Sequence, residues 1–116
     1  STHIVYSASG SWTDDYCLGL LTLTGDDPLD PHAWEKSPAP LLSKSDGVFG
    51  PGHCSFTISP DGKETWVVYH ANTAAGTGWN GRKVFAQPVK WDKQHRPVLG
   101  EPAAPGNEMR IAENGK

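Results

Sequence analysis

The sequence predicts an all-β protein in which short antiparallel strands are joined by tight turns. Its apolar runs are short and rich in β-branched and aromatic residues, and helical periodicity is nearly absent. The 116 residues include 13 Gly and 10 Pro, which favour turns over long helices. Turn signals at roughly ten-residue spacing divide the chain into about seven strands. This antiparallel meander is typical of sandwiches, barrels and propeller blades.

The first half of the chain contains three segments that we expect to be extended. The run "THIVYSAS" (2–9) ends at "GSWTDD", and "YCLGLLTLT" (16–24) is apolar enough to form a largely buried strand. Next, "GDDPLDPHAW" is a polar connection with room for one helical turn. Two prolines confine "WEKSPAPLLS" (34–43) to an edge strand or an extended segment, because proline cannot donate to a sheet ladder. The following "KSDGVFGPGH" is expected to be a loop with a tight Gly-Pro-Gly turn.

The second half contains a hairpin signal. "CSFTISP" and "TWVVYHAN" read as strands, and "SPDGKE" between them carries the Pro-Asp-Gly chemistry of a turn. "TAAGTGWNG" is a loop of small residues, "RKVFAQPVKW" (82–91) alternates like a strand, and "DKQHRP" turns into a short edge at "PVLG".

A weak internal repeat favours a β-propeller over a sandwich. "HIVYSAS…YCLGLLTLT…AWEKSPAPLL" and "TWVVYHAN…KVFAQPVKWD…RPVLGEP" share one order of strand, loop, strand and proline-limited edge, about 60 residues apart. We therefore expect antiparallel four-stranded blades, about one and three-quarter of them. Residues 1–45 would form an incomplete blade and 46–106 a complete one, together a partial propeller, and 107–116 an irregular tail.

Charge, hydropathy and cysteine content exclude several classes of protein. The net charge is −3 with both signs interspersed, so we expect no nucleic-acid partner. No apolar run approaches the ~20 residues that span a bilayer, and no membrane partner is expected. No signal-peptide pattern is visible, although a removed leader would leave secretion open. Cys17 and Cys54 permit one disulfide or two free thiols, and no CxxC spacing indicates zinc.

The histidine in "VFGPGHCSF" is the first candidate for function. His53 opens a strand, where its imidazole would point to a propeller axis and bind a metal or a ligand, or would simply bond the backbone of the turn. Cys54 cannot pair with it as a nucleophile, since neighbouring strand residues point to opposite faces. His70 is interpreted as a satisfied, half-buried strand residue. The other histidines lie at a terminus or in turns and are expected to be solvated: His3, His32 and His95.

Carboxylates offer a second line of interpretation, because glycoside hydrolysis needs two of them across the sugar. Nearly all of the 13 acidic residues lie in turn contexts. Only Asp14 and Asp15, flanked by Trp12 and Tyr16, resemble a site, since aromatic rings suit sugar faces. A solvated turn is the preferred alternative. No nucleophile elbow GxSxG is present, and "GTGWNG" precedes no helix that would cradle phosphate.

Three stretches carry a family resemblance: "YSASGSWTDDYCLGLLT", "VFGPGHCSFTISPDGKETWVVYHA" and "GRKVFAQPVKWDKQHRPVLGEPAAPG". Over residues 4 to about 106 the chain resembles glycoside hydrolase family 43, most of all its α-L-arabinofuranosidase-type members. The resemblance implies a five-bladed β-propeller that inverts configuration at arabinosides or xylosides. It also implies an aspartate base, a second aspartate that tunes the acid, and a glutamate acid.

The same resemblance assigns roles to individual residues. His53 matches the "GPGH" histidine at the propeller centre, which implies a cation such as calcium, or a water, beneath the substrate. Trp12 and Tyr16 are implied to lie on a loop near the sugar pocket, and Arg82 or Lys83 near an arginine that faces it. The family more often has Asn where this chain has Cys54. Substrate binding is therefore expected at His53, Trp12, Tyr16 and Arg82, with His53 also the metal ligand.

None of the three catalytic carboxylates has an expected counterpart here, because the resemblance aligns the chain with the last part of the propeller, most of blade four and all of blade five. The resemblance implies a glycosidase-like protein that is inactive alone or active only on assembly. The alternative is a non-catalytic carbohydrate-binding or self-assembling propeller fragment. Expected partners are a plant cell-wall saccharide containing arabinose or xylose, and either further copies in a homo-oligomer or the remaining blades. Secretion or a periplasmic location follows from the family.

Overall fold

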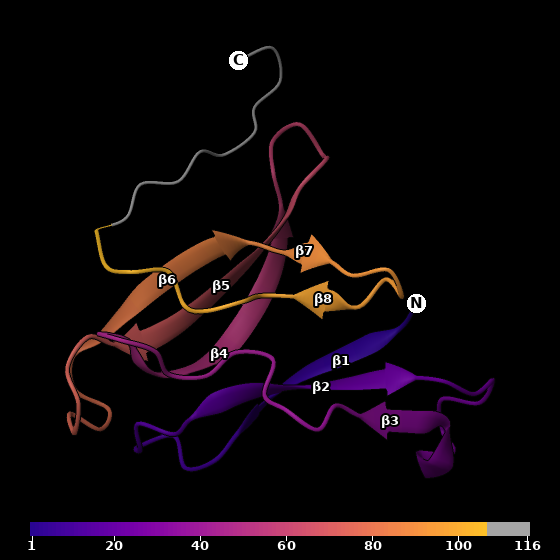
Figure 1. Cartoon of the computed structure of the whole chain (residues 1–116), viewed down its shortest axis with the longest axis horizontal. Coiled ribbons are helices and arrows are strands. Elements are labelled where there is room, and N and C mark those ends of the chain that lie inside the picture. The colour runs from indigo at the N-terminus through magenta and orange to yellow at the C-terminus, as the bar shows by residue number, and fades with distance from the viewer. Residues whose placement is uncertain (107–116) are drawn as a thin grey trace.

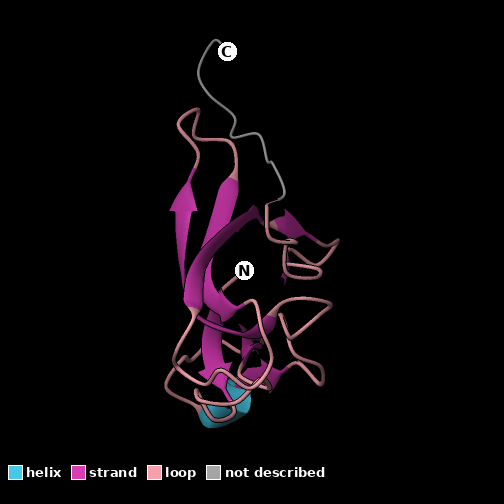
Figure 2. Ribbon diagram, turned by 90° about the vertical axis from the view of Figure 1, so that its left-hand side faces the viewer, coloured by secondary structure: helices cyan, strands magenta, loops and turns pink. Residues whose placement is uncertain are grey.

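A computed structural model describes residues 1–106 of the chain, in which nearly all regular structure is β-strand (Figures 1 and 2). The strands form three antiparallel sheets, with the orders β1-β2-β3, β4-β5-β6 and β7-β8. One 3-10 turn, η1 (Pro31–Ala33), is the expected helical turn, and the Asp30 carboxylate caps it by accepting from the His32 N–H. The all-β prediction is confirmed.

The first sheet joins β1 (His3–Ala8), β2 (Cys17–Leu23) and β3 (Trp34–Lys36). Of the segment 34–43, only the first three residues form a strand, because prolines follow at 38 and 40. The chain then returns to β2 through a single bridge between Leu18 and Leu42. This sheet has three strands.

The second sheet joins β4 (Phe49–Ile58), β5 (Thr65–Asn72) and β6 (Arg82–Pro88), and its first two strands are the expected hairpin. The expected loop at "FGPGH" is wrong, because β4 begins at Phe49 and Gly52 pairs with His70 across the sheet. The β4–β5 register shifts on both sides of Gly52, so these residues form a bulged strand. Glycine and proline thus mark a bulge here and not a turn.

The third sheet is a short arm made of β7 (Lys90–Trp91) and β8 (Pro97–Val98). The chain after it runs beside β6 without a backbone ladder, held by the side chain of Gln87. That amide donates to the carbonyl oxygens of Leu99 (2.9 Å) and Glu101 (3.2 Å), and its oxygen accepts from the Ala103 N–H (3.0 Å). Prolines at 88, 102 and 105 lack ladder donors, which explains why a side chain replaces a fourth strand.

The core lies between the two larger sheets and draws on both halves of the chain. Leu18, Leu42 and Val48 come from the first half, and Val67 and Tyr69 are among those from the second. Figure 1 shows the two sheets side by side, with β4 running next to β1. Residues far apart in sequence therefore share one buried cluster, and neither sheet buries its apolar face alone.

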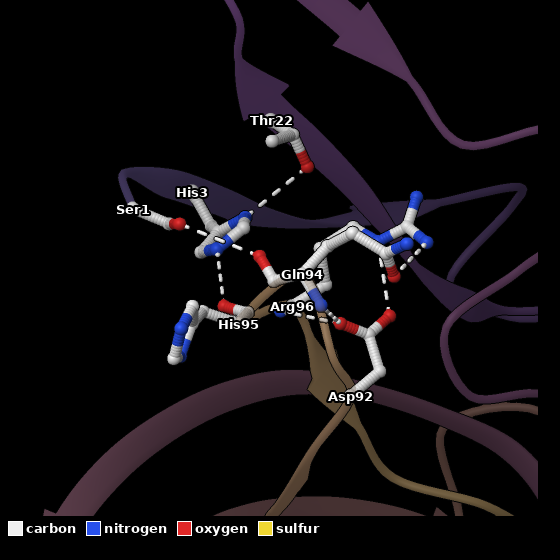
Figure 3. Close-up of polar contacts among 7 residues, drawn as sticks. All are labelled: Ser1, His3, Thr22, Asp92, Gln94, His95 and Arg96. Carbon is white, nitrogen blue, oxygen red and sulfur yellow. Dashed lines mark hydrogen bonds and ion pairs between the residues drawn. The ribbon is translucent and has the colours of Figure 1, made fainter.

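The β7–β8 turn is tied to the start of β1 by His3 (Figure 3). The His3 Nε2 lies 3.0 Å from the carbonyl oxygen of His95, and its Nδ1 lies 3.1 Å from the Thr22 hydroxyl. Since a carbonyl only accepts, Nε2 carries the proton and donates. Next to it, the Asp92 carboxylate accepts from the Arg96 backbone and guanidinium. The expectation that His3 is solvated is wrong, because its ring bridges two elements.

Both cysteines are free thiols, so the disulfide alternative is excluded in this structure. Within residues 1–106, no helix is long and apolar enough to cross a membrane. The strands β1–β3 fall before residue 45 and β4–β8 after residue 46. Their assignment to an incomplete and a complete blade stays a prediction, and the expected tail at 107–116 lies outside the described residues.

The hydrogen bonds of the Gln87 side chain to the backbone of residues 99–103, called the Gln87 clamp below, predict a large loss of stability in Gln87→Leu. The Gln87 side chain is buried, and its oxygen also accepts the Tyr69 hydroxyl at 2.6 Å. Leucine would leave the buried Tyr69 hydroxyl and the Leu99 carbonyl without these partners, which costs about 1–3 kcal/mol per group. We expect chemical denaturation to show a loss of at least ~2 kcal/mol. The exposed Gln94→Leu is the control and should change stability by less than ~0.5 kcal/mol. Equal effects of the two changes would contradict the clamp.

Tyr69 also predicts an alkaline instability. Burial raises the pKa of the Tyr69 phenol to about 12. Above the ordinary pKa of ~10, the unfolded chain loses this proton while the folded chain keeps it, so the free energy of unfolding falls as pH rises towards 12. Denaturant midpoints measured from pH 9 to 12 should show this decline, and Tyr69→Phe should reduce it. An unchanged slope in Tyr69→Phe would assign the decline to other groups.

Candidate functional site

Three segments distant in sequence meet at one end of the second sheet. They are the β1–β2 loop (9–16), the β5–β6 loop (73–81) and the start of β4. The Asp14 carboxylate accepts from the Gly76 N–H at 3.0 and 3.2 Å, and the Asp14 carbonyl accepts from the Gly50 N–H at 2.9 Å. One residue of the first loop therefore holds both other segments in place.

Tyr16, His70 and His53 form a stack of three rings at this junction. The Tyr16 and His70 ring centroids are 6.0 Å apart with an angle of 22° between planes, and those of His70 and His53 are 5.8 Å apart with an angle of 15°. A Cβ atom at Gly52 would overlap the Tyr16 ring, so only glycine permits this packing. The structure thus brings together two predicted site residues, Tyr16 and His53, through a third, His70.

The backbone presents His53 at the open end of this ring stack. Its φ of 54° is left-handed, which is uncommon for a residue with a side chain, and its backbone N–H donates to the Ser7 hydroxyl at 2.9 Å. The residue is exposed, and it lies within the bulged part of β4. Strain of this kind at an exposed ring is typical of positions that serve a site.

His70 was not among the predicted site residues. It is half-buried as expected, but its Nδ1 is buried and has no hydrogen-bond partner among residues 1–106. Burial lowers the His70 pKa, and the nearby Arg82 and His53 lower it further. The neutral imidazole is therefore favoured. Strand alternation could have indicated this role, because β5 places His70 and Asn72 on one face and pairs His70 with Gly52.

Arg82 and the two loop tryptophans lie on the same side of the molecule as the ring stack. The Arg82 guanidinium donates to the Ser11 carbonyl at 2.9 Å, next to Trp12, and its charge acts on His70. The Trp79 indole N–H donates to the Ser11 hydroxyl at 3.0 Å, and its ring meets that of Trp12 edge to face. Arg82 is therefore the basic residue of β6 that reaches the site.

Cys54 points away from this site, as strand alternation predicts. Its side chain packs against the core and lines an apolar cavity of about 430 Å³ together with Phe56 and Trp91. Burial raises the Cys54 thiol pKa, which keeps the sulfur protonated. Cys54 thus packs against the core while His53 stacks on His70, and the absence of a catalytic pair between them stays a prediction.

The carboxylates near the site are engaged in structural contacts. Asp14 joins the two loops, and Asp15 pairs with Lys44 at 2.7 Å on the surface. Away from the site, in the β4–β5 and β7–β8 turns, hydrogen bonds from the Ser59 hydroxyl and the Arg96 backbone lower the pKa of Asp61 and of Asp92. A general acid in glycoside hydrolysis needs the opposite shift.

Metal binding at His53 finds little support in the described part of the chain. Between residues 1 and 106, no three His, Cys, Asp or Glu side chains gather so as to hold an ion. Calcium prefers six to eight oxygen ligands, and two stacked imidazoles do not supply them. A cation beneath His53 would need most of its ligands from elsewhere, and it stays a prediction.

Comparison with known proteins shows what kind of chain carries this site. The sequence model described as "Glycosyl hydrolases family 43" matches residues 1–97. An extracellular exo-alpha-(1->5)-L-arabinofuranosidase of Streptomyces avermitilis is 39% identical over 112 residues, which cover 89% of this chain and 23% of that protein. An alpha-L-arabinofuranosidase 43 of Humicola insolens is 34% identical over 123 residues, covering 97% of this chain and 25% of that protein.

The crystal structure of an alpha-L-arabinofuranosidase from Lactobacillus brevis superposes with a TM-score of 0.80 and 32% sequence identity, covering 91% of this chain and 35% of that one. The chain thus spans about a quarter of the length of the curated relatives it matches. The superposition confirms the prediction of a partial β-propeller. The family match, the similarity to the arabinofuranosidases and the superposition of the fold agree. The chain belongs to glycosyl hydrolase family 43.

Proposed function

We propose that residues 1–106 form one wall of an arabinoside-binding site in an α-L-arabinofuranosidase-like glycosidase. The observation that carries this proposal is the stack of Tyr16, His70 and His53, with Arg82 beside it. Aromatic faces and hydrogen-bonding groups in one place suit a neutral sugar, which offers both C–H faces and hydroxyls. The names of the arabinofuranosidase relatives support arabinose over other sugars, and a xylose-containing saccharide is the second choice.

We further propose that hydrolysis requires carboxylates from outside this segment. The mechanism needs an acid and a base on opposite faces of the sugar, and the carboxylates near the ring stack serve loop and surface contacts instead. Each missing general acid or base would cost about 10²- to 10⁴-fold in rate. The remaining blades of a propeller, or further copies in a homo-oligomer, would supply these groups.

Within this site, the exposed His53 would contact the sugar. His70 orients the His53 ring by stacking, and the buried Tyr16 ring supports His70 from its other side. Arg82 would act near the sugar through its charge and through its hold on the β1–β2 loop. The family resemblance implies a calcium ion or a water near His53. The extracellular description of the Streptomyces relative supports secretion of this chain as well.

A carbohydrate-binding module without catalysis is the second candidate. Exposed Trp12 and Trp79 favour it, because surface tryptophans bind sugars without any acid–base pair. The two candidates share the binding wall and differ only in turnover, so one set of measurements separates them.

The proposal predicts that the full chain binds arabinose-containing oligosaccharides and that His53→Asn weakens this binding about five- to tenfold, because a hydrogen-bonding imidazole contributes about 1 kcal/mol. Asparagine is chosen since it tolerates the left-handed backbone of this position. Calorimetric titration is the measurement. His95→Asn is the matched control, because His95 is also an exposed histidine with a left-handed φ of 60° and lies in the β7–β8 turn.

The outcomes divide the proposal into its parts. If the chain bound neither arabinose- nor xylose-containing saccharides, the proposed sugar-binding site would be refuted. Equal weakening by His53→Asn and His95→Asn would refute the role of the ring stack. Release of arabinose by the purified chain in a form that light scattering shows to be monomeric would place the acid and base within one copy, against the proposal that other segments or copies supply them.

A further inference from the structure

We propose that Trp12 and Trp79 form an aromatic corner that binds a second and third sugar unit of a neutral oligosaccharide. This inference rests on the proposed function of the adjoining ring stack and extends it to the length of the ligand. The aromatic corner consists of these two side chains, from the β1–β2 loop and the β5–β6 loop.

The corner exposes large apolar surface where a folded chain would ordinarily bury it. Each of the two tryptophan side chains is 62% exposed, although Trp is on average a highly buried residue type. The ring centroids lie 6.3 Å apart and the planes meet at 79°. One ring packs its edge against the other, and faces at nearly a right angle stay open to ligand. Two exposed aromatic residues placed together on loops mark a binding surface.

Hydrogen bonds hold both loops of the corner in place before any ligand arrives. Ser11 is the shared anchor, because its hydroxyl accepts from the Trp79 indole and its carbonyl accepts from Arg82. The Asp14 contact to Gly76 fixes the same two loops a few residues away. A pre-ordered aromatic pair loses little conformational entropy on binding, so its contact area contributes more fully to affinity.

The chemistry of the corner favours an uncharged sugar. Indole rings suit the C–H faces of sugars, and the neighbouring hydroxyl and amide groups suit their polar edges. Of the charged side chains at these loops, Asp15 pairs with Lys44 at the surface, whereas Arg82 and Asp14 hydrogen-bond to backbone groups. They strengthen the scaffold, and neither charge is needed to hold a ligand on the aromatic faces.

The position of the corner sets the length of the ligand. Three residues lie between Trp12 and Tyr16, so their Cα atoms are at most ~14 Å apart. The corner therefore lies within reach of an oligosaccharide of about three sugar units whose first unit is held at the ring stack. In this arrangement the ring stack binds the first sugar unit and the aromatic corner binds the next two. The corner would therefore make the chain bind oligosaccharides more tightly than monosaccharides.

The test compares α-(1→5)-linked arabinotriose with methyl α-L-arabinofuranoside on the full chain, by calorimetry and tryptophan fluorescence. Trp79→Ala should weaken arabinotriose binding about tenfold and leave the monosaccharide affinity within about twofold. Trp12→Ala should show the same selective loss. Trp79→Phe keeps an aromatic face without the indole donor and should retain most of the trisaccharide affinity. Trp91→Ala, at a residue 52% exposed on β7, is the matched control and should change neither affinity.

Each alternative result has a defined meaning. Unchanged trisaccharide binding in both Trp79→Ala and Trp12→Ala overturns the aromatic corner and leaves the proposed function standing. An equal loss for both ligands also overturns it, since the tryptophans would then act through the ring stack. Concentration-dependent association that Trp79→Ala abolishes, without an effect on sugar, would make the corner a protein contact instead. If the unaltered chain binds neither ligand, the proposed function fails together with this inference.

Discussion

The contact of the Tyr16 ring with the backbone of Gly52 is the interaction on which the geometry of this molecule's functional end depends. A side chain at position 52 would occupy the volume of that ring. Because Tyr16 lies flat over the bulged strand, the β1–β2 loop is drawn onto β4 and β5, where His70 and His53 complete the ring stack. The loop contacts made by Asp14 and Ser11 then become possible as well. One missing Cβ atom thus adds a further connection between two sheets that already share an apolar core and the hydrogen bond from His53 to Ser7.

The local sequence pattern predicts much of the strand content. Alternation of apolar and polar residues, turn-forming residues and prolines each determine backbone conformation within a few residues. The β4–β5 hairpin and the short η1 turn follow from such signals. The start of β4 does not, because glycine and proline are used in bulges as well as in turns, and local sequence cannot separate the two. The Gln87 clamp and the His3 bridge also escape prediction. Their partners lie 12 and 92 residues away, and a single polar side chain leaves no periodic signal.

The site itself is predicted in part. The family resemblance points to His53, Tyr16, Trp12 and Arg82 (or Lys83) as site residues. The structure places the first four at one end of the second sheet, and their roles stay predictions. His70 was interpreted as structural, because a histidine inside a strand ordinarily has its hydrogen bonds satisfied. Its position between two other rings depends on pairing with Gly52, which only the folded register supplies. Loop residues such as Ser11 gain their role from contacts with residues about 70 positions away.

The left-handed backbone at His53 also bears on how this position can vary among relatives. A residue at position 53 must meet two independent requirements: it must adopt the left-handed backbone conformation, and it must supply an aromatic ring to the stack. Glycine and asparagine pass the first and fail the second, whereas aromatic residues keep a ring and incur a conformational cost. β-branched residues fail both, since their crowded Cβ is least tolerated at positive φ. Few residue types can therefore replace His53 without a cost. Each substitution either strains the left-handed backbone or removes the ring from the stack.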